Sequence, residues 1–167
     1  MSLIILEGVD GTGKTTLARK LYDQYGYRIL KRNAPNGHPL VEYTASIEAA
    51  NGANVVCDRW HLGEAVYSVT RRDGQTKMTG AIFEAIEEYL LDKGALLVLC
   101  VADQYANDCV LEARGEVHPK IEEERALFEL ETSRSALPLM TVTLGMSDVA
   151  VHAAHASAQR LEYDLCN

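Results

Sequence analysis

The feature that most constrains this chain is a glycine-rich segment that follows its first apolar run. Residues 3–6 form the apolar run, and the segment after it reads Gly8-Val9-Asp10-Gly11-Thr12-Gly13-Lys14-Thr15, which matches G-x-x-x-x-G-K-[ST] at every specified position. Glycines let the backbone curl so that its N–H groups point inward, where they can bind phosphate oxygens. The motif requires a strand before it and a helix after it. It therefore predicts the opening strand–loop–helix unit of a phosphate-binding α/β domain.

The chemistry of this loop assigns roles to its last residues. The helix that begins near Gly13 adds the positive end of its dipole. Lys14 supplies a charge for the β- and γ-phosphates of a nucleoside triphosphate, and the hydroxyl of Thr15 can bind Mg²⁺. We therefore predict a nucleoside-triphosphate site, ATP in a kinase, with Mg²⁺ as its cofactor. Its residues are Gly8, Asp10, Gly11, Thr12, Gly13, Lys14, Thr15 and Thr16.

Short apolar runs alternate with longer amphipathic stretches along the rest of the chain. Continuous apolar runs of this length, bounded by turn residues, are typical of parallel strands that are covered on both faces. We expect strands at 3–6, 27–30, 54–57, 95–101 and 140–144, and helices at 17–25, 78–90, 121–130 and 149–165. The alternation predicts an α/β protein with the three-layer P-loop NTPase fold, a five-stranded parallel sheet with helices on both faces.

Length and composition limit the other possibilities. A chain of 167 residues hides about 69% of its surface on folding, enough for one core, so residues 1–167 are expected to form a single domain. The 16 basic and 24 acidic residues give a net charge of −8, which argues against nucleic acid or an anionic membrane as a partner. The longest apolar stretch is far shorter than the ~20 residues that span a bilayer.

The cysteines indicate a reducing compartment. Cys57, Cys100, Cys109 and Cys166 form no C-x-x-C pair, and the chain opens without the layout of a signal peptide. We therefore expect reduced thiols in a cytoplasmic protein, or in the host cytoplasm if the protein is viral.

Three classes of triphosphate-binding protein compete: a kinase, a GTPase switch and a motor ATPase. A GTPase reads guanine with an N-K-x-D segment near the fourth strand, whereas here Val101 is followed by Ala102-Asp103-Gln104. Motor ATPases need more chain for their sensor and finger elements. A kinase for a small acceptor needs Mg²⁺, an acceptor pocket and arginines that neutralise the transferring group.

Asp58 and Arg59 follow the third predicted strand. The carboxyl ends of parallel strands form the edge that faces ligands in an open α/β sheet. Asp58 could organise Mg²⁺ or orient an acceptor oxygen, and the planar fork of Arg59 could bind an acceptor phosphate. The pair therefore favours a kinase.

Two segments resemble thymidylate kinases. Residues 6–16 are similar to the E-G-x-D-G-x-G-K-[ST] loop of these enzymes, and residues 58–68 resemble their D-R-[YF]-x-x-S-x-x-A-Y-Q segment. In the second segment Asp58, Arg59 and Tyr67 match and Trp60 replaces another aromatic residue. Gly63, Val66 and Ser68 depart from the pattern. In length and style the chain is closer to bacteriophage deoxynucleoside monophosphate kinases.

The resemblance implies transfer of the γ-phosphoryl group of ATP to a deoxynucleoside monophosphate. Lys14, Asp58 and Arg114 would be catalytic, and Thr15 and Asp58 would bind the metal. The acceptor would be bound by Arg59, Tyr67, Arg72 and Tyr43. We interpret Arg71 as a solvated neighbour of Arg72, and His61 as a residue without a partner for general-base chemistry. Dimers are usual in this group, so a homodimer is also implied.

A mobile lid in these kinases follows the fourth strand, and the matching stretch is about 111–122. Some members carry an arginine inside the phosphate loop, and others have a small residue there and arginines in the lid. Gly11 occupies that position, so this chain resembles the second version and Arg114 is the candidate charge stabiliser. Lys120 and Arg125 are weaker candidates, because they could equally belong to a solvated helix face.

The base specificity departs from the resemblance. Thymidylate kinases read thymine with an F-x-x-x-R segment, whereas residues 39–50 here contain no Phe and no Arg, and Tyr43 is the only aromatic residue. Glu42 or Glu48 could accept from an exocyclic amine, or be solvated. We therefore expect a deoxynucleotide other than dTMP, or several, as acceptor. Two alternatives stay open: a kinase for a hydroxyl of a nucleoside or other small molecule, and an ATP-binding protein without transfer activity.

Overall fold

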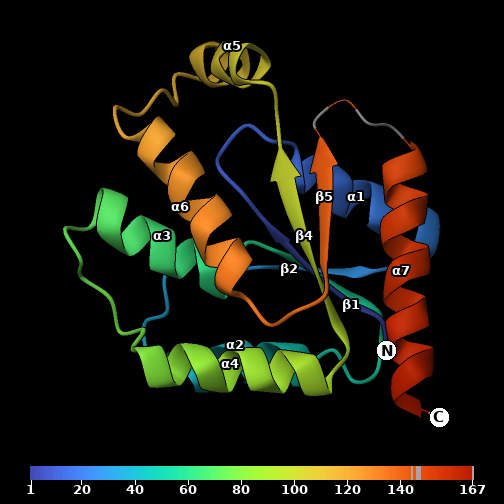
Figure 1. The fold of residues 1–167 in the computed structure, drawn as a ribbon. Coiled ribbons are helices and arrows are strands. Elements are labelled where there is room, and N and C mark those ends of the chain that lie inside the picture. Colours follow the sequence, from blue (N-terminus) through green and yellow to red (C-terminus); the bar gives the residue numbers. More distant parts are fainter. Residues whose placement is uncertain (144, 146–147, 167) are drawn as a thin grey trace.

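The apolar runs of the sequence form one parallel sheet in the computed structural model, which describes residues 1–143, 145 and 148–166 (Figure 1). Its strands are β1 (Leu3–Glu7), β2 (Arg28–Lys31), β3 (Val55–Asp58), β4 (Ala95–Val101) and β5 (Leu139–Thr143). They lie in the order β2-β3-β1-β4-β5, and every neighbouring pair is parallel. The predicted fold class is therefore confirmed. Leu144, the expected end of the last strand, lies outside the described residues.

Helices follow or precede every strand. They are α1 (Lys14–Tyr25), α2 (Pro39–Glu48), α3 (His61–Arg71), α4 (Gly80–Asp92), α5 (Gln104–Arg114), α6 (Ile121–Arg134) and α7 (Asp148–Cys166). The four predicted helical stretches are present, whereas the patterns did not single out α2, α3 or α5. Met78 precedes α4, because the Thr79 side chain caps this helix by accepting from the N–H of Ile82.

The alternation of side chains along β1 explains the three layers. Ile4 and Leu6 point to the face that α1 and α7 cover, and Leu3 and Ile5 point to the face that α2 and α4 cover. All four side chains are fully buried. In Figure 1, α7 flanks one side of the sheet, while α2 and α4 lie side by side below it.

The two edge strands differ from the expectation. Runs 27–30 and 140–144 were expected to be covered on both faces, yet Ile29 in β2 is 37% exposed and Thr141 and Thr143 in β5 are exposed. Each edge strand has a neighbour on one side only, and the helices centre on β1, β3 and β4, which are buried almost throughout. The expectation of full coverage is therefore wrong for β2 and β5.

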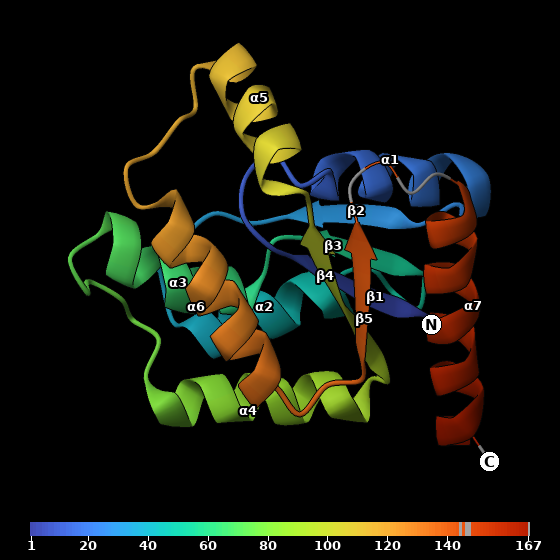
Figure 2. The same ribbon diagram turned by 45° about the horizontal axis from the view of Figure 1, so that its top comes forward.

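The sheet brings two of the predicted motifs together. β1 pairs with β3 so that Leu6 lies opposite Asp58, and the phosphate loop and Arg59 therefore start from neighbouring strand ends. Helix α5 stands apart from the sheet at this same end (Figure 2). The stretch 111–122 comprises the last residues of α5, the connection 115–120 and the start of α6. Its role as a lid stays a prediction.

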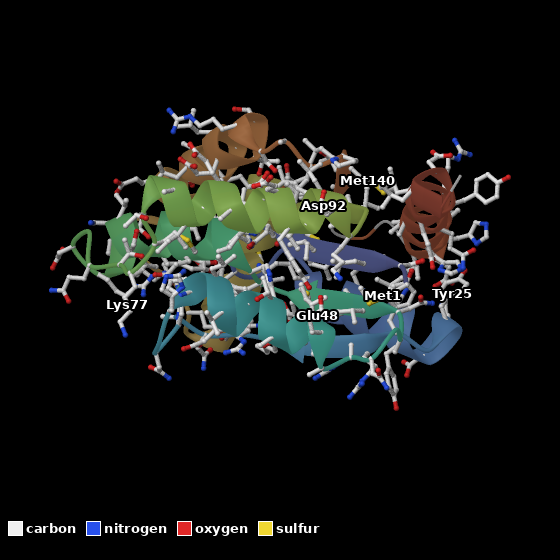
Figure 3. The ribbon with its side chains drawn as sticks, turned by 90° about the horizontal axis from the view of Figure 1, so that it is seen from below. Met1, Tyr25, Glu48, Lys77, Asp92 and Met140 are labelled. Carbon is white, nitrogen blue, oxygen red and sulfur yellow. The ribbon has the colours of Figure 1, made fainter. Side chains whose placement is uncertain are left out.

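The opposite end of the molecule holds the N-terminus. The amino group of Met1 pairs with Glu162 of α7, and in Figure 3 Met1 and Tyr25 lie near α7 while Lys77 is at the far side. No described helix is long and apolar enough to cross a membrane.

The three cysteines whose side chains are described are free thiols. Cys57 and Cys100 are buried in the sheet, and Cys109 is exposed on α5. Burial raises the pKa of the Cys100 thiol to about 12 and the pKa of Cys57 well above its usual value.

Candidate active site

The phosphate loop takes a conformation that requires glycine. Gly8, Gly11 and Gly13 have φ angles of +131°, +81° and +84°. A Cβ on Gly8 would lie 2.2 Å from the carbonyl oxygen of Cys100, and one on Gly11 would lie 2.4 Å from Nδ2 of Asn107. Backbone sterics and the neighbouring strand and helix therefore both exclude side chains here.

Lys14 begins α1 and reaches back over the loop. Its ammonium Nζ donates to the carbonyl oxygens of Gly8 and Val9 at 2.7 and 2.6 Å. The side chain is buried, and this burial together with the positive charge of Arg59 lowers the pKa of Lys14. The hydroxyl of Thr12 donates to the same Val9 carbonyl at 2.8 Å. The loop thus places a cation among its own backbone groups, beside a hollow that it lines.

Thr15 and Asp58, the two predicted metal ligands, are in contact. The hydroxyl of Thr15 donates to Oδ2 of Asp58 at 2.7 Å, and Nζ of Lys31 is 3.8 Å from the same oxygen. Both side chains offer the oxygen ligands that Mg²⁺ prefers, and Mg²⁺ commonly takes only one or two protein ligands beside phosphate and water. No group of three or more acidic, histidine or cysteine side chains in the described residues could hold a metal. The residues present fit Mg²⁺ bound together with a nucleotide.

Asp10, in the middle of the loop, links two arginines. It pairs with Arg59 and with Arg71, whose Nη2 donates to Oδ2 at 3.1 Å. Burial acts to raise the pKa of Asp10, but the charges of Arg59, Lys14 and Arg71 outweigh it and lower this pKa. Arg59 adopts φ +69°, a left-handed conformation that is uncommon outside glycine. The backbone turn after β3 therefore directs the Arg59 side chain back toward the phosphate loop.

Arg71 is not the solvated neighbour that the sequence pattern suggested. Its guanidinium donates to both carboxylate oxygens of Glu124, at 2.6 and 2.7 Å, and lies 4.3 Å from the centre of the Tyr67 ring. Glu124 belongs to α6 and is fully buried. No local signal could have found this contact, because its two residues lie 53 positions apart.

A cavity of about 210 Å³ lies beside these arginines. All four predicted acceptor residues line it, and so do residues that the patterns did not select. Its walls include Arg32, Tyr43, Arg59, Trp60, Gly63, Glu64, Tyr67, Arg71 and Arg72. The rings of Tyr43 and Trp60 lie 4.8 Å apart, and Arg72 donates to the Glu64 carboxylate at 2.7 Å. The cavity therefore combines aromatic walls with four guanidinium groups.

Arg114 lies near the phosphate loop but makes few contacts. Its side chain is 58% exposed, 3.8 Å from Glu116, and it lines one hollow with Lys14 and Arg59. Thr16 also lines this hollow and is exposed. Arg114 therefore lies beside the phosphate loop, and its role in phosphoryl transfer stays a prediction.

Arg125 belongs to a contact between helices rather than to a solvated face. It donates to Oδ1 of Asn107 and Oδ1 of Asp108 at 2.7 and 2.8 Å, and it pairs with Glu122. Asn107 in turn donates to the backbone oxygen of Asp10 at 2.8 Å. The patterns gave no signal for Asn107, yet it connects α5 to the phosphate loop.

Two buried acidic groups support the turn that carries Arg59. Oε1 of Glu7 accepts from the N–H groups of Trp60 and Gly63 at 2.9 and 3.1 Å. Burial raises the pKa of Glu7. His61 is bonded to Glu87, so the expectation that His61 lacks a partner is wrong. Burial acts to raise the pKa of Glu87, but its bonds to His61 and Ser135 lower it.

Three comparisons with known proteins bear on this geometry. The sequence matches no protein-family model and no curated protein. Solved structures match it along almost its whole length. One is the YorR protein of Bacillus subtilis in complex with phosphorylated GDP, with 25% identity and a TM-score of 0.76, covering 97% of this chain and 98% of that chain.

Two further structures are less similar. The deoxyadenosine kinase of M. mycoides with bound dATP has 12% identity and a TM-score of 0.62, covering 95% of this chain and 100% of that chain. A sugar kinase from a Janibacter species has 11% identity and a TM-score of 0.57, covering 99% and 98%. Together with the phosphate loop and the sheet order, these likenesses show that the chain has the fold of the P-loop nucleoside and nucleotide kinases.

Proposed function

We propose that this protein transfers the γ-phosphoryl group of ATP to the phosphate of a deoxynucleoside monophosphate. A bond forms between an oxygen of the acceptor phosphate and the γ-phosphorus, the bond from that phosphorus to the β,γ-bridging oxygen breaks, and ADP and a deoxynucleoside diphosphate leave. The observation that carries the proposal is the cavity beside the phosphate loop, whose walls carry four arginines and a single acidic residue, Glu64. Such a lining favours an acceptor that is itself an anion.

The proposal assigns each polar group a task. Lys14 and the loop N–H groups hold the donor phosphates, and Arg59 and Arg72 hold the acceptor. Thr15 and Asp58 would hold Mg²⁺, directly or through water, and the ion supplies charge neutralisation at the phosphates when it is bound. Arg114 covers the charge that develops on the transferring group. Positioning and electrostatic stabilisation of this kind supply most of the catalysis in phosphoryl transfer.

Unpaired buried groups in the cavity wall support a polar ligand. Nε of Arg59, Nε1 of Trp60 and the hydroxyl of Tyr67 are buried and have no hydrogen-bond partner among the residues that the structure describes. Buried polar atoms are paired in most proteins, by protein, water or ligand. A nucleotide offers phosphate and sugar oxygens to such donors and a flat base to the aromatic rings.

Glu42 and Glu48 of α2, the two candidates for recognising the base of the acceptor, are both paired with other side chains. Glu42 accepts from Arg32 at 2.9 Å, and Glu48 accepts from Tyr89 at 2.7 Å and pairs with Lys93. Both carboxylates are therefore already paired, that of Glu42 with a wall residue of the cavity and that of Glu48 with residues outside it. Aromatic stacking accepts any base, so we expect a deoxynucleotide other than dTMP, or several, rather than strict thymidylate specificity.

A substrate panel tests the proposal. The protein is incubated with Mg-ATP and each of dAMP, dGMP, dCMP and dTMP, and in parallel with the four matching nucleosides, and the products are separated by anion-exchange chromatography. We expect diphosphates from the monophosphates and little product from the nucleosides. Monophosphates formed from nucleosides alone would establish a hydroxyl acceptor instead, and no product from any compound would indicate an ATP-binding protein without transfer. A preference for dTMP above about 10³-fold in kcat/KM would reveal a thymine reader.

A further inference from the structure

Two adjacent arginines at the end of α3 point in different directions: Arg71 is the last residue of the helix, and Arg72 follows it. Nη2 of Arg72 donates to the Glu64 carboxylate at 2.7 Å, and Thr76 donates to the same carboxylate. Arg71 instead shares Asp10 of the phosphate loop with Arg59. Arg72 has left the helical conformation, with φ −132° and ψ 20°, so its side chain takes a different direction from that of Arg71. One of the two arginines therefore faces the phosphate loop. That arginine is Arg71.

Glu124 holds Arg71 in a defined orientation. Nε and Nη2 of the guanidinium donate to the two carboxylate oxygens, a bidentate geometry. The carboxylate is fully buried and also accepts from the hydroxyl of Thr70 at 3.0 Å. The other face of the guanidinium lies over the ring of Tyr67. Both side chains of the pair are therefore fixed before any ligand binds.

This orientation leaves part of the guanidinium available to a ligand. Within the described residues, Nη1 of Arg71 has no hydrogen-bond partner, whereas Nε and Nη2 are engaged. The side chain is 32% exposed and lines the same cavity as Arg59. The carboxylate of Asp10 bonded to both arginines shows that one anionic group can reach the two guanidinium groups at once.

We propose that Arg71 binds the acceptor phosphate together with Arg59, and that Glu124 is the positioning residue that aims Arg71. This inference rests on the proposed function, because it takes a monophosphate as the acceptor. Glu124 lies in the first turn of α6, immediately after the predicted lid. It therefore connects the acceptor site to the helix that follows the lid.

Binding without ATP tests the role of Arg71 separately from catalysis. Titration calorimetry compares a deoxynucleoside monophosphate with its matching nucleoside, for the wild type, Arg71→Gln and the control Arg160→Gln, which changes an exposed arginine of α7. We expect Arg71→Gln to weaken monophosphate binding by about 10- to 100-fold, as for a lost charge-assisted hydrogen bond. Nucleoside binding should stay unchanged, and so should both affinities in Arg160→Gln.

Kinetics test the positioning role of Glu124. Glu124→Gln should raise KM for the acceptor as Arg71→Gln does, with little change in KM for ATP. The double variant Arg71→Gln/Glu124→Gln replaces the ion pair by two neutral amides, and its effect should equal that of either single variant rather than the product of the two effects. It also serves if a single variant fails to fold, because it leaves no unpaired buried charge.

The outcomes separate this inference from the proposed function. If the wild type binds monophosphate more tightly than nucleoside and the Arg71 variants keep that preference, Arg71 does not bind the phosphate and the inference is overturned alone. If the wild type shows no preference for monophosphate, the proposed function fails and the inference fails with it. Additive effects of the two single variants would refute the positioning role of Glu124.

Discussion

Replacing Gly11 by alanine isolates the contact between the phosphate loop and α5. Gly11 and Gly52 have the same φ of +81°, so alanine at either position meets the same backbone strain, about 1–2 kcal/mol. A Cβ on Gly52 meets nothing within 4 Å, whereas one on Gly11 lies 2.4 Å from Nδ2 of Asn107. Gly52→Ala therefore serves as the matched control.

The added penalty at Gly11 follows from how Asn107 is held. Ordinary contacts between heavy atoms lie near 3.5–4.0 Å, so the loop and Asn107 must separate by about 1 Å. Asn107 is fully buried and bonded at both ends of its amide, to Asp10 and Arg125. Displacement leaves buried groups unpaired, which costs about 1–3 kcal/mol beyond the shared strain. A displacement of about 1 Å in the loop should also lower kcat by about 10²-fold.

The assay combines urea unfolding with turnover of Mg-ATP for both variants. Gly52→Ala should lose stability but keep its kcat, and Gly11→Ala should lose both. Gly11→Ala/Asn107→Ala removes the overlapping atom, so its losses should be smaller than the sum of the two single changes. Equal stability and equal activity in Gly11→Ala and Gly52→Ala would refute the steric reasoning.

Three further predictions test the site. Arg114→Ala should lower kcat by about 10³-fold or more, with a smaller effect on KM. Arg125→Ala loses its bonds to α5 and should mainly lower the free energy of unfolding. Equal kinetic effects of the two variants would show that Arg114 is the wrong lid residue. Lys14→Ala should keep the circular dichroism spectrum and lose turnover by orders of magnitude, and an active, folded variant would contradict the donor site. Glu7→Gln keeps a side-chain oxygen that can accept from the N–H groups of Trp60 and Gly63 but removes the carboxylate charge. Because the folded-state pKa of Glu7 is raised above 4.5, its contribution to stability is present below that pH and is lost as pH rises. Urea unfolding at pH 4 and pH 8 should therefore show the variant gaining stability relative to the wild type as pH rises, and a constant difference would exclude a raised pKa of Glu7.

Local sequence patterns were enough to predict the fold and the ATP-binding side of the site. The motif that ends in Lys14 and Thr15 specifies its own loop, and continuous apolar runs specify buried parallel strands. Because such strands align their carboxyl ends, the proximity of Asp58 to Thr15 followed without any contact information. The exposure of β2 and β5 was not predicted, although Arg28 and Lys31 in β2 and the threonines of β5 distinguish these edge strands from the wholly apolar β4.

Contacts between distant segments were beyond the patterns. Asn107 and Asp10 are 97 positions apart, and nothing in an isolated asparagine distinguishes a loop anchor from a solvated residue. The pair Arg71 and Arg72 shows the same limit more sharply. The sequence alone does not distinguish these two adjacent arginines. The contact of α3 with α6, through the bonds from Arg71 to Glu124, determines that Arg71 faces the phosphate loop.

The uneven exposure of the thiols makes the protein convenient for fluorescence work. The thiolate is the reactive form of cysteine, and the raised pKa values of the buried Cys57 and Cys100 keep it scarce there at neutral pH. After Cys166→Ser, a maleimide dye should attach to Cys109, which lies two positions from Asn107 and so close to the anchor of the phosphate loop. Emission from that dye would report nucleotide binding in variants that no longer turn over, so donor affinity and phosphoryl transfer can be measured independently.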